Sequence, residues 1–256
     1  MNQVAKQRHR LSHRVRYALR HPERIRPHLR RTWRDWKFRL SGRRDHVSFY
    51  RAVMRDDVAK NPELAVGSAT HDRWLALGKL QFDYLVEHGL APGDDVLEIG
   101  CGNLRAGWRI IEHLEPGRYW GTDISPDVLL AANSTVERYE LQAKEPRLQL
   151  VDDLTFGWAP DERFDLIHAH SVFSHCPLAI IEECFAHVGR VLRPDGRFDL
   201  TFNATSGEEH HVLHEDYYYR PDTLIRLAGR YGFDARVMDD WAPRHKQAKL
   251  RLTHAG

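Results

Sequence analysis

The sequence predicts an α/β protein in which a parallel sheet is covered by helices on both faces. Two observations lead to this fold class. From residue 95 onward, short apolar runs that suit buried strands alternate with longer segments of helical periodicity. Such alternation builds a parallel sheet, because each helix returns the chain to the starting edge before the next strand. The length, 256 residues, allows one such domain with an appendage.

Seven strands and four helices are expected in this part of the chain. The strands cover residues 95–99, 118–123, 148–151, 165–169, 197–202, 234–238 and 249–253. The helices cover roughly residues 104–114, 126–139, 177–191 and 221–231. Ser125 followed by Pro126 is typical of a helix start, and the RPDG segment at 193–196 is typical of a turn.

The segment that precedes the sheet is expected to be a helical cap over residues 46–91, leading into a core at residues 92–256. The loop GLAPGDD at 89–95 separates the cap from the first strand. A composition of 42% hydrophobic and 29% charged residues is ordinary for a globular protein.

Charge divides the chain into two unequal parts. Residues 1–45 hold 15 Lys and Arg against 3 Asp and Glu, a balance of +12. Because the whole chain carries +2, the remainder carries −10. This split predicts a basic arm at residues 1–45 attached to an acidic body.

The arm has the pattern of an amphipathic helix, with Pro27 suited to its first turn. Four apolar residues share one helical face: Leu29, Trp33, Trp36 and Leu40. Basic residues fill much of the rest: Arg30, Arg31, Arg34 and Lys37. Such a helix suits an anionic membrane interface or the phosphates of a nucleic acid. Packing on the acidic body, a solvated tail and an organelle transit peptide are the alternatives.

Other classes of protein fit the sequence poorly. No apolar run approaches the ~20 residues that span a bilayer, and the N-terminus lacks the apolar core of a secretory signal. The three cysteines form no CxxC pair, which favours a reducing compartment over a disulfide framework. We therefore expect a cytoplasmic protein, held at the inner face of the membrane if the arm binds lipid.

Ligands of such sheets bind outside the carboxyl ends of the strands, so the residues after each strand are the candidates for a site. The first strand leads into Glu98, Gly100 and Gly102. A dinucleotide fold would place a third glycine at position 105, which is Arg105. This departure argues against a nicotinamide-dependent oxidoreductase. The later strands lead into Asp123, into Asp152 and Asp153, and into His170, Ser171, Ser174 and His175.

Five ordered segments resemble the class I S-adenosylmethionine-dependent methyltransferases over about residues 92–200. They are VLEIGCG, YWGTDIS, LQLVDDL, FDLIHAHSVFSH and RVLRPDGRF. The end of the chain is also similar, with YRPDTLIRLAGRYGFDA as the last helix and KLRLTH as an antiparallel seventh strand. The resemblance implies a Rossmann-like seven-stranded sheet and S-adenosylmethionine as cofactor. CGNLRAG resembles a subgroup with Leu-Arg in place of the usual third glycine.

The resemblance also implies roles in cofactor binding. Residues Gly100, Cys101 and Gly102 would line the pocket, although the Cys101 side chain is expected to be a small packed hydrophobe. Glu98 would orient this loop or reach the methionine end. Leu104 stands where many members have glycine, and it makes Arg105 a candidate for the methionine carboxylate or the substrate. As a residue type, Arg105 equally suits a surface position on a helix.

Further roles follow at the later strand ends. Asp123 would hold the ribose hydroxyls and Ile124 would pack on the adenine. The adenine amino group would be bound by Asp152 or Asp153, and Leu154 would donate its backbone N–H to the ring. Asp153 could instead be only a cap. The carbonyl of His170 would face the methionine ammonium.

Catalysis of methyl transfer requires that the acceptor be oriented toward the methyl group and, if the acceptor is a hydroxyl, that a base remove its proton. His175 is the first candidate, because histidine titrates in the useful range; its alternative role is to cap the helix from 177. Tyr218 and Glu209 come next. They lie in the stretch 206–222, where the family often builds a substrate lid.

Metal binding is not expected. The spacings of His210, His211 and His214 suit a metal, but no HExxH motif accompanies them. By elimination, the expected acceptor is a hydroxyl of a small molecule or glycan. Methylation of RNA or protein, and a non-catalytic module that binds membrane or nucleic acid, are the alternatives.

Overall fold

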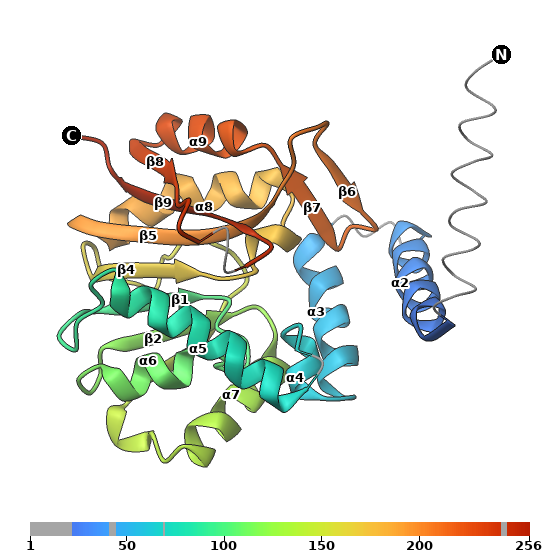
Figure 1. The fold of residues 1–256 in the computed structure, drawn as a ribbon, viewed down its shortest axis with the longest axis horizontal. Coiled ribbons are helices and arrows are strands. Elements are labelled where there is room, and N and C mark those ends of the chain that lie inside the picture. The colour runs from blue at the N-terminus through green and yellow to red at the C-terminus, as the bar shows by residue number, and fades with distance from the viewer. Residues whose placement is uncertain (1–21, 41–44, 69, 242–244) are drawn as a thin grey trace. The chain divides into compact units, whose positions relative to one another are not determined.

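The computed structural model describes residues 22–40, 45–68, 70–241 and 245–256 (Figure 1). The chain divides into two compact units, Met1–Asp45 and His46–Gly256. The described part of the first unit is mainly helix α2, Pro22–Leu40. This helix begins at Pro22, which occupies its first turn, so Pro27, predicted to lie in a first turn, is its sixth residue. The most N-terminal part of the predicted arm, residues 1–21, lies outside the described residues.

A nine-stranded sheet forms the centre of the second unit, in the order β3-β2-β1-β4-β5-β7-β6, with β9 paired to both β5 and β8. Strands β1 to β5 run parallel, whereas β9 is antiparallel to β5, as the sequence predicted. The strands span Val96–Ile99, Tyr119–Asp123, Arg147–Leu150, Phe164–Ala169, Leu192–Ala204, His210–Val212, Asp216–Tyr219, Phe233–Val237 and Ala248–His254, for β1 to β9.

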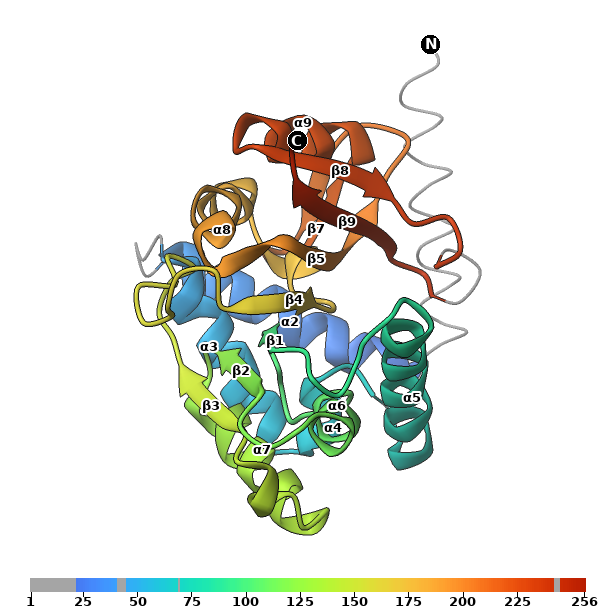
Figure 2. The same cartoon turned by 90° about the vertical axis from the view of Figure 1, so that its left-hand side faces the viewer.

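Helices cover both faces of this sheet, each over its own apolar layer (Figure 2). One face carries α5 (His71–Glu87), α6 (Gly107–His113) and α7 (Pro126–Arg138). The other face carries α8 (Leu178–Val191) and α9 (Pro221–Arg230). The predicted α/β fold with helices on both faces is therefore confirmed.

Two sequence predictions about the sheet were wrong. Seven strands were expected, and the structure has nine, because the stretch predicted as a lid loop contains the hairpin β6–β7. Tyr218 of β7 pairs with Asn203 at the end of β5, so the hairpin extends the sheet. The RPDG segment at 193–196 is not a free turn: it belongs to β5, where the pairing with β4 shifts register. A bulge accommodates its extra residues.

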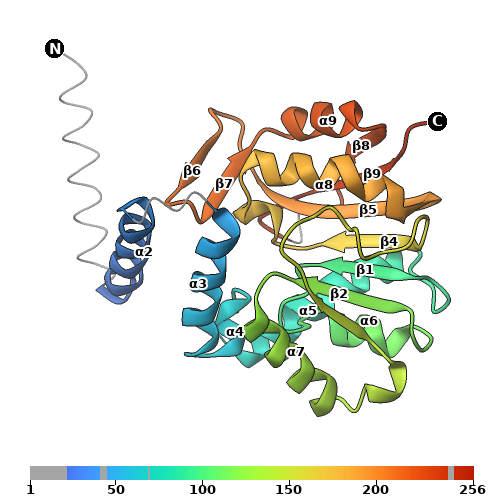
Figure 3. The ribbon, with the colours of Figure 1, turned by 180° about the vertical axis from the view of Figure 1, so that it is seen from behind.

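Helices α3 (His46–Val58) and α4 (Pro62–Ala65) precede α5 in the predicted helical cap. Short 3₁₀ turns follow α7 and β4, η1 at Gln142–Lys144 and η2 at Phe173–His175. Figures 1 and 3 show α3 standing beside the edge of the sheet at which β4 ends. Among the described helices, none is both long and apolar enough to cross a membrane.

Candidate active site

The loop after β1 has the backbone of a close-approach turn. Gly100 and Gly102 have φ angles of 65° and 57°, in the left-handed region that favours glycine. A Cβ atom on Gly100 would overlap Cγ2 of Val172, and one on Gly102 would lie 2.8 Å from Cγ1 of Val66. Both positions therefore need glycine, because a Cβ atom would meet the side chain of a neighbouring segment.

Leu104 keeps the left-handed conformation without being glycine, with a φ of 63°. A non-glycine residue in this region carries about 1–3 kcal/mol of strain. The Leu104 side chain is fully buried in the apolar layer of α6, and burial of a leucine offsets about 1.5–3 kcal/mol. Leucine in place of glycine therefore changes the side chain at this position but keeps the backbone conformation of the turn.

Glu98 is buried beneath this loop. Its carboxylate accepts a hydrogen bond of 2.5 Å from the Tyr119 hydroxyl. Burial raises the pKa of Glu98 to about 7, although the Tyr119 hydrogen bond and the nearby Arg105 charge oppose the shift. The Arg105 guanidinium donates to the Val66 carbonyl, so this side chain turns toward the segment that precedes α5 and is no surface residue of a helix.

Asp123, at the end of β2, is tied to the loop. Its carboxylate accepts from the backbone N–H of Gly102 at 3.1 Å and of Ser125 at 2.9 Å. Burial raises the pKa of Asp123 to about 6, and these hydrogen bonds and the Arg51 charge lower it in part. Asp123 therefore links the end of β2 to the loop that follows β1. Ser125 also caps α7.

The residues after β3 separate into different roles. The Asp152 carboxylate accepts from Arg51 at the rim of the site. Asp153 instead accepts from the backbone N–H and hydroxyl of Thr155, at 2.9 and 2.7 Å, which lowers its pKa and makes it a turn cap. The backbone N–H of Leu154 donates to the Glu183 carboxylate at 2.7 Å. Of the two carboxylates, only that of Asp153 is thus used in a local cap.

After β4 the backbone turns sharply at Ser171, where φ is 61°. The Ser171 N–H donates to the Thr201 hydroxyl at 2.8 Å. The His170 ring is buried and packs edge-on against His245 and Trp241, with centroid distances of 4.9 and 5.6 Å. Burial lowers the pKa of His170 well below its ordinary value, so the ring is neutral.

His175, at the end of η2, has one ring nitrogen committed to the backbone. Nδ1 lies 2.6 Å from the Glu215 carbonyl oxygen and 3.4 Å from a carboxylate oxygen of Asp216. A carbonyl oxygen only accepts, so Nδ1 carries the proton and Nε2 of the neutral ring carries the lone pair. The predicted helix cap is not made: α8 starts after Pro177 with no side-chain cap.

Sequence reasoning missed three residues of α3. Arg51 binds the ends of two strands, and the Tyr50 ring lies 5.4 Å from the His175 ring. His46 Nε2 donates to the His175 carbonyl at 2.7 Å. The available signal was the run HVSFYR, in which these polar and aromatic residues surround the buried Phe49.

Comparisons with known proteins agree with this fold. Residues 97–198 match the family model of a methyltransferase domain. A magnesium protoporphyrin IX methyltransferase from Synechocystis PCC 6803, solved with bound SAM, is 16% identical with a TM-score of 0.64, covering 84% of this chain and 99% of that one. The DhpI–SAH complex is 15% identical with a TM-score of 0.56, covering 82% and 96%. A TehB-like SAM-dependent methyltransferase from Corynebacterium glutamicum ATCC 13032 Kitasato is 19% identical with a TM-score of 0.54, covering 79% and 98%.

Residues 97–198 thus match a methyltransferase domain, and the fold is shared with solved S-adenosylmethionine-dependent methyltransferases. Because the sequence identities are low, the solved structures show only that the fold is similar. The match to a methyltransferase domain comes from the family model. The methyltransferase domain begins within β1 and ends within β5 in that match. All eleven predicted cofactor-binding residues lie inside the matched range.

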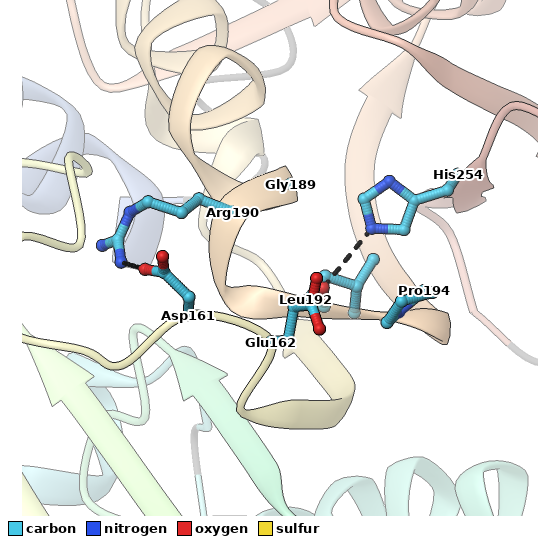
Figure 4. Close-up of a pocket in the computed structure, with 7 residues that line it drawn as sticks. All are labelled: Asp161, Glu162, Gly189, Arg190, Leu192, Pro194 and His254. Atoms are coloured by element: carbon cyan, nitrogen blue, oxygen red, sulfur yellow. Dashed lines mark hydrogen bonds and ion pairs between the residues drawn. The ribbon is translucent and has the colours of Figure 1, made fainter.

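Figure 4 shows a pocket formed by the segment before β4, the end of α8, the start of β5 and the end of the antiparallel β9. Arg190 pairs there with Asp161, and His254 Nε2 lies 3.4 Å from the Leu192 carbonyl. None of the predicted site residues lines this pocket. It lies at the amino ends of the parallel strands, where ligands of such sheets do not bind.

Substitution of Gly100 by alanine tests whether the turn after β1 requires glycine. We expect Gly100→Ala to lower the free energy of unfolding by about 1–3 kcal/mol, because the new Cβ is strained and overlaps Val172. Denaturant unfolding measures the change. Gly157→Ala is the control, since its Cβ would meet nothing closer than 3.9 Å. Val172→Ala in the Gly100→Ala background should restore part of the loss; equal stability of the two glycine variants would contradict the prediction.

Proposed function

We propose that the protein methylates a hydroxyl group of a small molecule or glycan, with His175 as the general base. The main support for this proposal is the tautomer of His175, with the proton on Nδ1. Its Nδ1–H is engaged by the Glu215 carbonyl, which leaves the lone pair on Nε2 for the proton of an acceptor hydroxyl. A carboxylate oxygen of Asp216 lies 3.4 Å from the same Nδ1.

The strand ends carry groups whose chemistry suits S-adenosylmethionine. The glycine turn allows close approach of the backbone, and the Asp123 carboxylate at the end of β2 can accept from ribose hydroxyls. Asp152 supports the adenine end, and Ile124 provides an apolar contact for the ring. When bound, the cofactor supplies an electrophilic methyl group on a positively charged sulfur. The role of this chain is then to align the acceptor oxygen and remove its proton.

The buried Glu98 and the partly buried Arg105 are charged groups close to the glycine turn. Arg105 is held by the Val66 carbonyl and interacts electrostatically with Glu98 and His170. We assign this pair to the methionine end, where Arg105 would attract the carboxylate and the His170 carbonyl would face the ammonium group. Cys101, with a buried thiol, contributes backbone and volume to the pocket. The Leu154 N–H, which is bound to Glu183, is given no role toward adenine.

Cofactor affinity should depend on the ionisation of Asp123. The folded pKa of about 6 lies above the ordinary value of 3.8, because burial disfavours the charged form. Protonation removes an acceptor for the ribose, so affinity for S-adenosylhomocysteine should fall as pH drops below about 6, by up to about tenfold per pH unit. Calorimetry between about pH 5 and 8 measures the profile.

Two variants test whether the pH dependence of cofactor affinity comes from Asp123. Asp123→Asn should bind about 10- to 100-fold more weakly at pH 7.5, on the scale of a lost charged acceptor, and its profile near pH 6 should be flatter. Asp153→Asn, whose parent carboxylate caps Thr155, is the matched control and should keep the parent profile. An unchanged affinity in Asp123→Asn would remove Asp123 from the pocket.

We also propose that α2 binds an anionic membrane surface. Four of its apolar residues are solvent-exposed: Leu29 by 61%, Trp33 by 55%, Trp36 by 56% and Leu40 by 66%. The helix carries seven Arg and Lys against two acidic residues, and Lys37 lies 3.6 Å above the Trp33 ring. A helix with Trp on one face and cations around it suits the interface between lipid headgroups and acyl chains.

A further inference from the structure

Arg51 connects α3 to the carboxyl ends of two neighbouring strands. Its Nε donates to the Ile124 carbonyl at 2.5 Å, just beyond β2. Its Nη2 donates to the Val151 carbonyl at 3.1 Å and to the Asp152 carboxylate, just beyond β3. One guanidinium therefore reaches three acceptors on both strand ends at which the proposed function puts the adenosine.

Charge and burial add to this geometry. The Arg51 side chain is 31% exposed, whereas Asp152 is 79% exposed at the rim. Because Asp152 is so open to solvent, its carboxylate would sample many orientations without a partner, and the Arg51 fork restricts them. The same positive charge favours the ionised form of the partly buried Asp123 and lowers its pKa. Arg51 thus acts on both carboxylates of the adenosine end.

The first residue of α3 contacts the backbone of the proposed general base, His175. His46, five residues before Arg51, donates to the His175 carbonyl at 2.7 Å. Tyr50 lies between the anchors, with its ring 6.0 Å from the His46 ring and 5.4 Å from the His175 ring. α3 therefore spans the carboxyl edge of the sheet from the adenosine end to the base, as Figure 3 lets the reader follow.

We propose that Arg51 is a positioning residue for S-adenosylmethionine, which sets the Ile124 and Asp152 groups that receive the adenine. This inference rests on the proposed function. Arg51 acts through those groups and through the placement of α3. The consequence is that one helix joins cofactor binding to the arrangement of Tyr50 and His175 at the acceptor side.

Calorimetry with S-adenosylhomocysteine tests the proposal in the full chain. Arg51→Ala should weaken binding by about tenfold or more, and Arg51→Lys, which keeps the charge without the fork, should lie between it and the parent. Arg55→Ala is the matched control: it removes the same charge from an exposed position of the same helix and should bind within about twofold of the parent.

Two further measurements separate positioning from a loss of fold. Arg51→Ala should weaken binding of 5′-methylthioadenosine by the same factor, because that probe keeps only the adenosine end. In a double-mutant cycle, Asp152→Asn and Arg51→Ala should be non-additive, since they share one contact. Thermal unfolding of the free proteins checks the fold, and Arg51→Gln replaces Arg51→Ala if the alanine variant does not fold.

The outcomes are distinguishable. A parent chain that binds neither probe would remove the proposed function itself. A parent that binds, with Arg51→Ala at the same affinity or with an additive cycle, would overturn only the role of Arg51. Tighter binding by Arg51→Ala would also overturn it, and would mean that the guanidinium competes with the adenine amino group for Asp152.

Discussion

Replacing His175 by alanine is expected to lower the turnover number by about 10²–10⁴-fold while the affinity for S-adenosylhomocysteine stays within about twofold. The physical reason is that Nε2 is the proton acceptor for the substrate hydroxyl, while the cofactor is bound by other strand ends. Turnover is measured as transfer of an isotopically labelled methyl group from S-adenosylmethionine to acceptors in a cell extract, with the product identified by mass spectrometry.

His187→Ala is the control for this experiment, because His187 is exposed on α8. Turnover of His175→Ala within a few-fold of the parent would make His175 a structural residue. Tyr218 and Glu209 would then be tested as bases. Both have structural partners in the hairpin: Tyr218 stacks on His210 at 4.7 Å, and Glu209 accepts from the Arg220 N–H at 2.9 Å. These contacts are a reason to test His175 first.

Removal of the arm is expected to lower binding to anionic vesicles by about 10³-fold or more. Each cation near such a surface contributes about 1 kcal/mol, and α2 alone has seven Arg and Lys. A chain that begins at His46 should therefore lose vesicle binding and keep its affinity for S-adenosylhomocysteine. Co-sedimentation with vesicles rich in phosphatidylserine measures the first, and calorimetry the second.

Variants of the full chain separate charge from apolar contact. Trp33→Ala with Trp36→Ala should weaken the part of the binding that high salt leaves, whereas the electrostatic part should fall as salt rises. Neutral phosphatidylcholine vesicles are the control. Equal vesicle binding with and without the arm would contradict the proposal. Preferential binding of RNA would favour the nucleic-acid alternative, and loss of cofactor binding on truncation would assign the arm to the pocket.

The sequence alone determined the α/β fold and the order of the main strands. The seven predicted strands became β1, β2, β3, β4, β5, β8 and β9. The central strands β1 and β4 are buried almost throughout, and burial on both faces of a parallel sheet requires such apolar runs. The hairpin β6–β7 escaped prediction because its three- and four-residue strands are rich in His and Tyr and have no apolar alternation.

The sequence also indicated which residues follow each strand, and therefore where to look for a site. Periodicity and motif spacing report local geometry, so Glu98, Gly100 and Asp123 could be proposed from the chain itself. The same information left Asp152 and Asp153 equivalent. The hydrogen bonds of Asp153 to Thr155, two residues away, distinguish them only once the backbone turn is known.

Only the tertiary structure decided which distant groups share the site. Arg51 reaches residues about a hundred positions away, and His175 takes its tautomer from Glu215 on another segment. No local pattern encodes such contacts, because they depend on how α3 and the β6–β7 hairpin pack against the carboxyl edge of the sheet. The side chains that orient a base or a carboxylate are therefore determined by packing between distant segments, whereas the strands that carry them are determined by the local pattern of apolar residues.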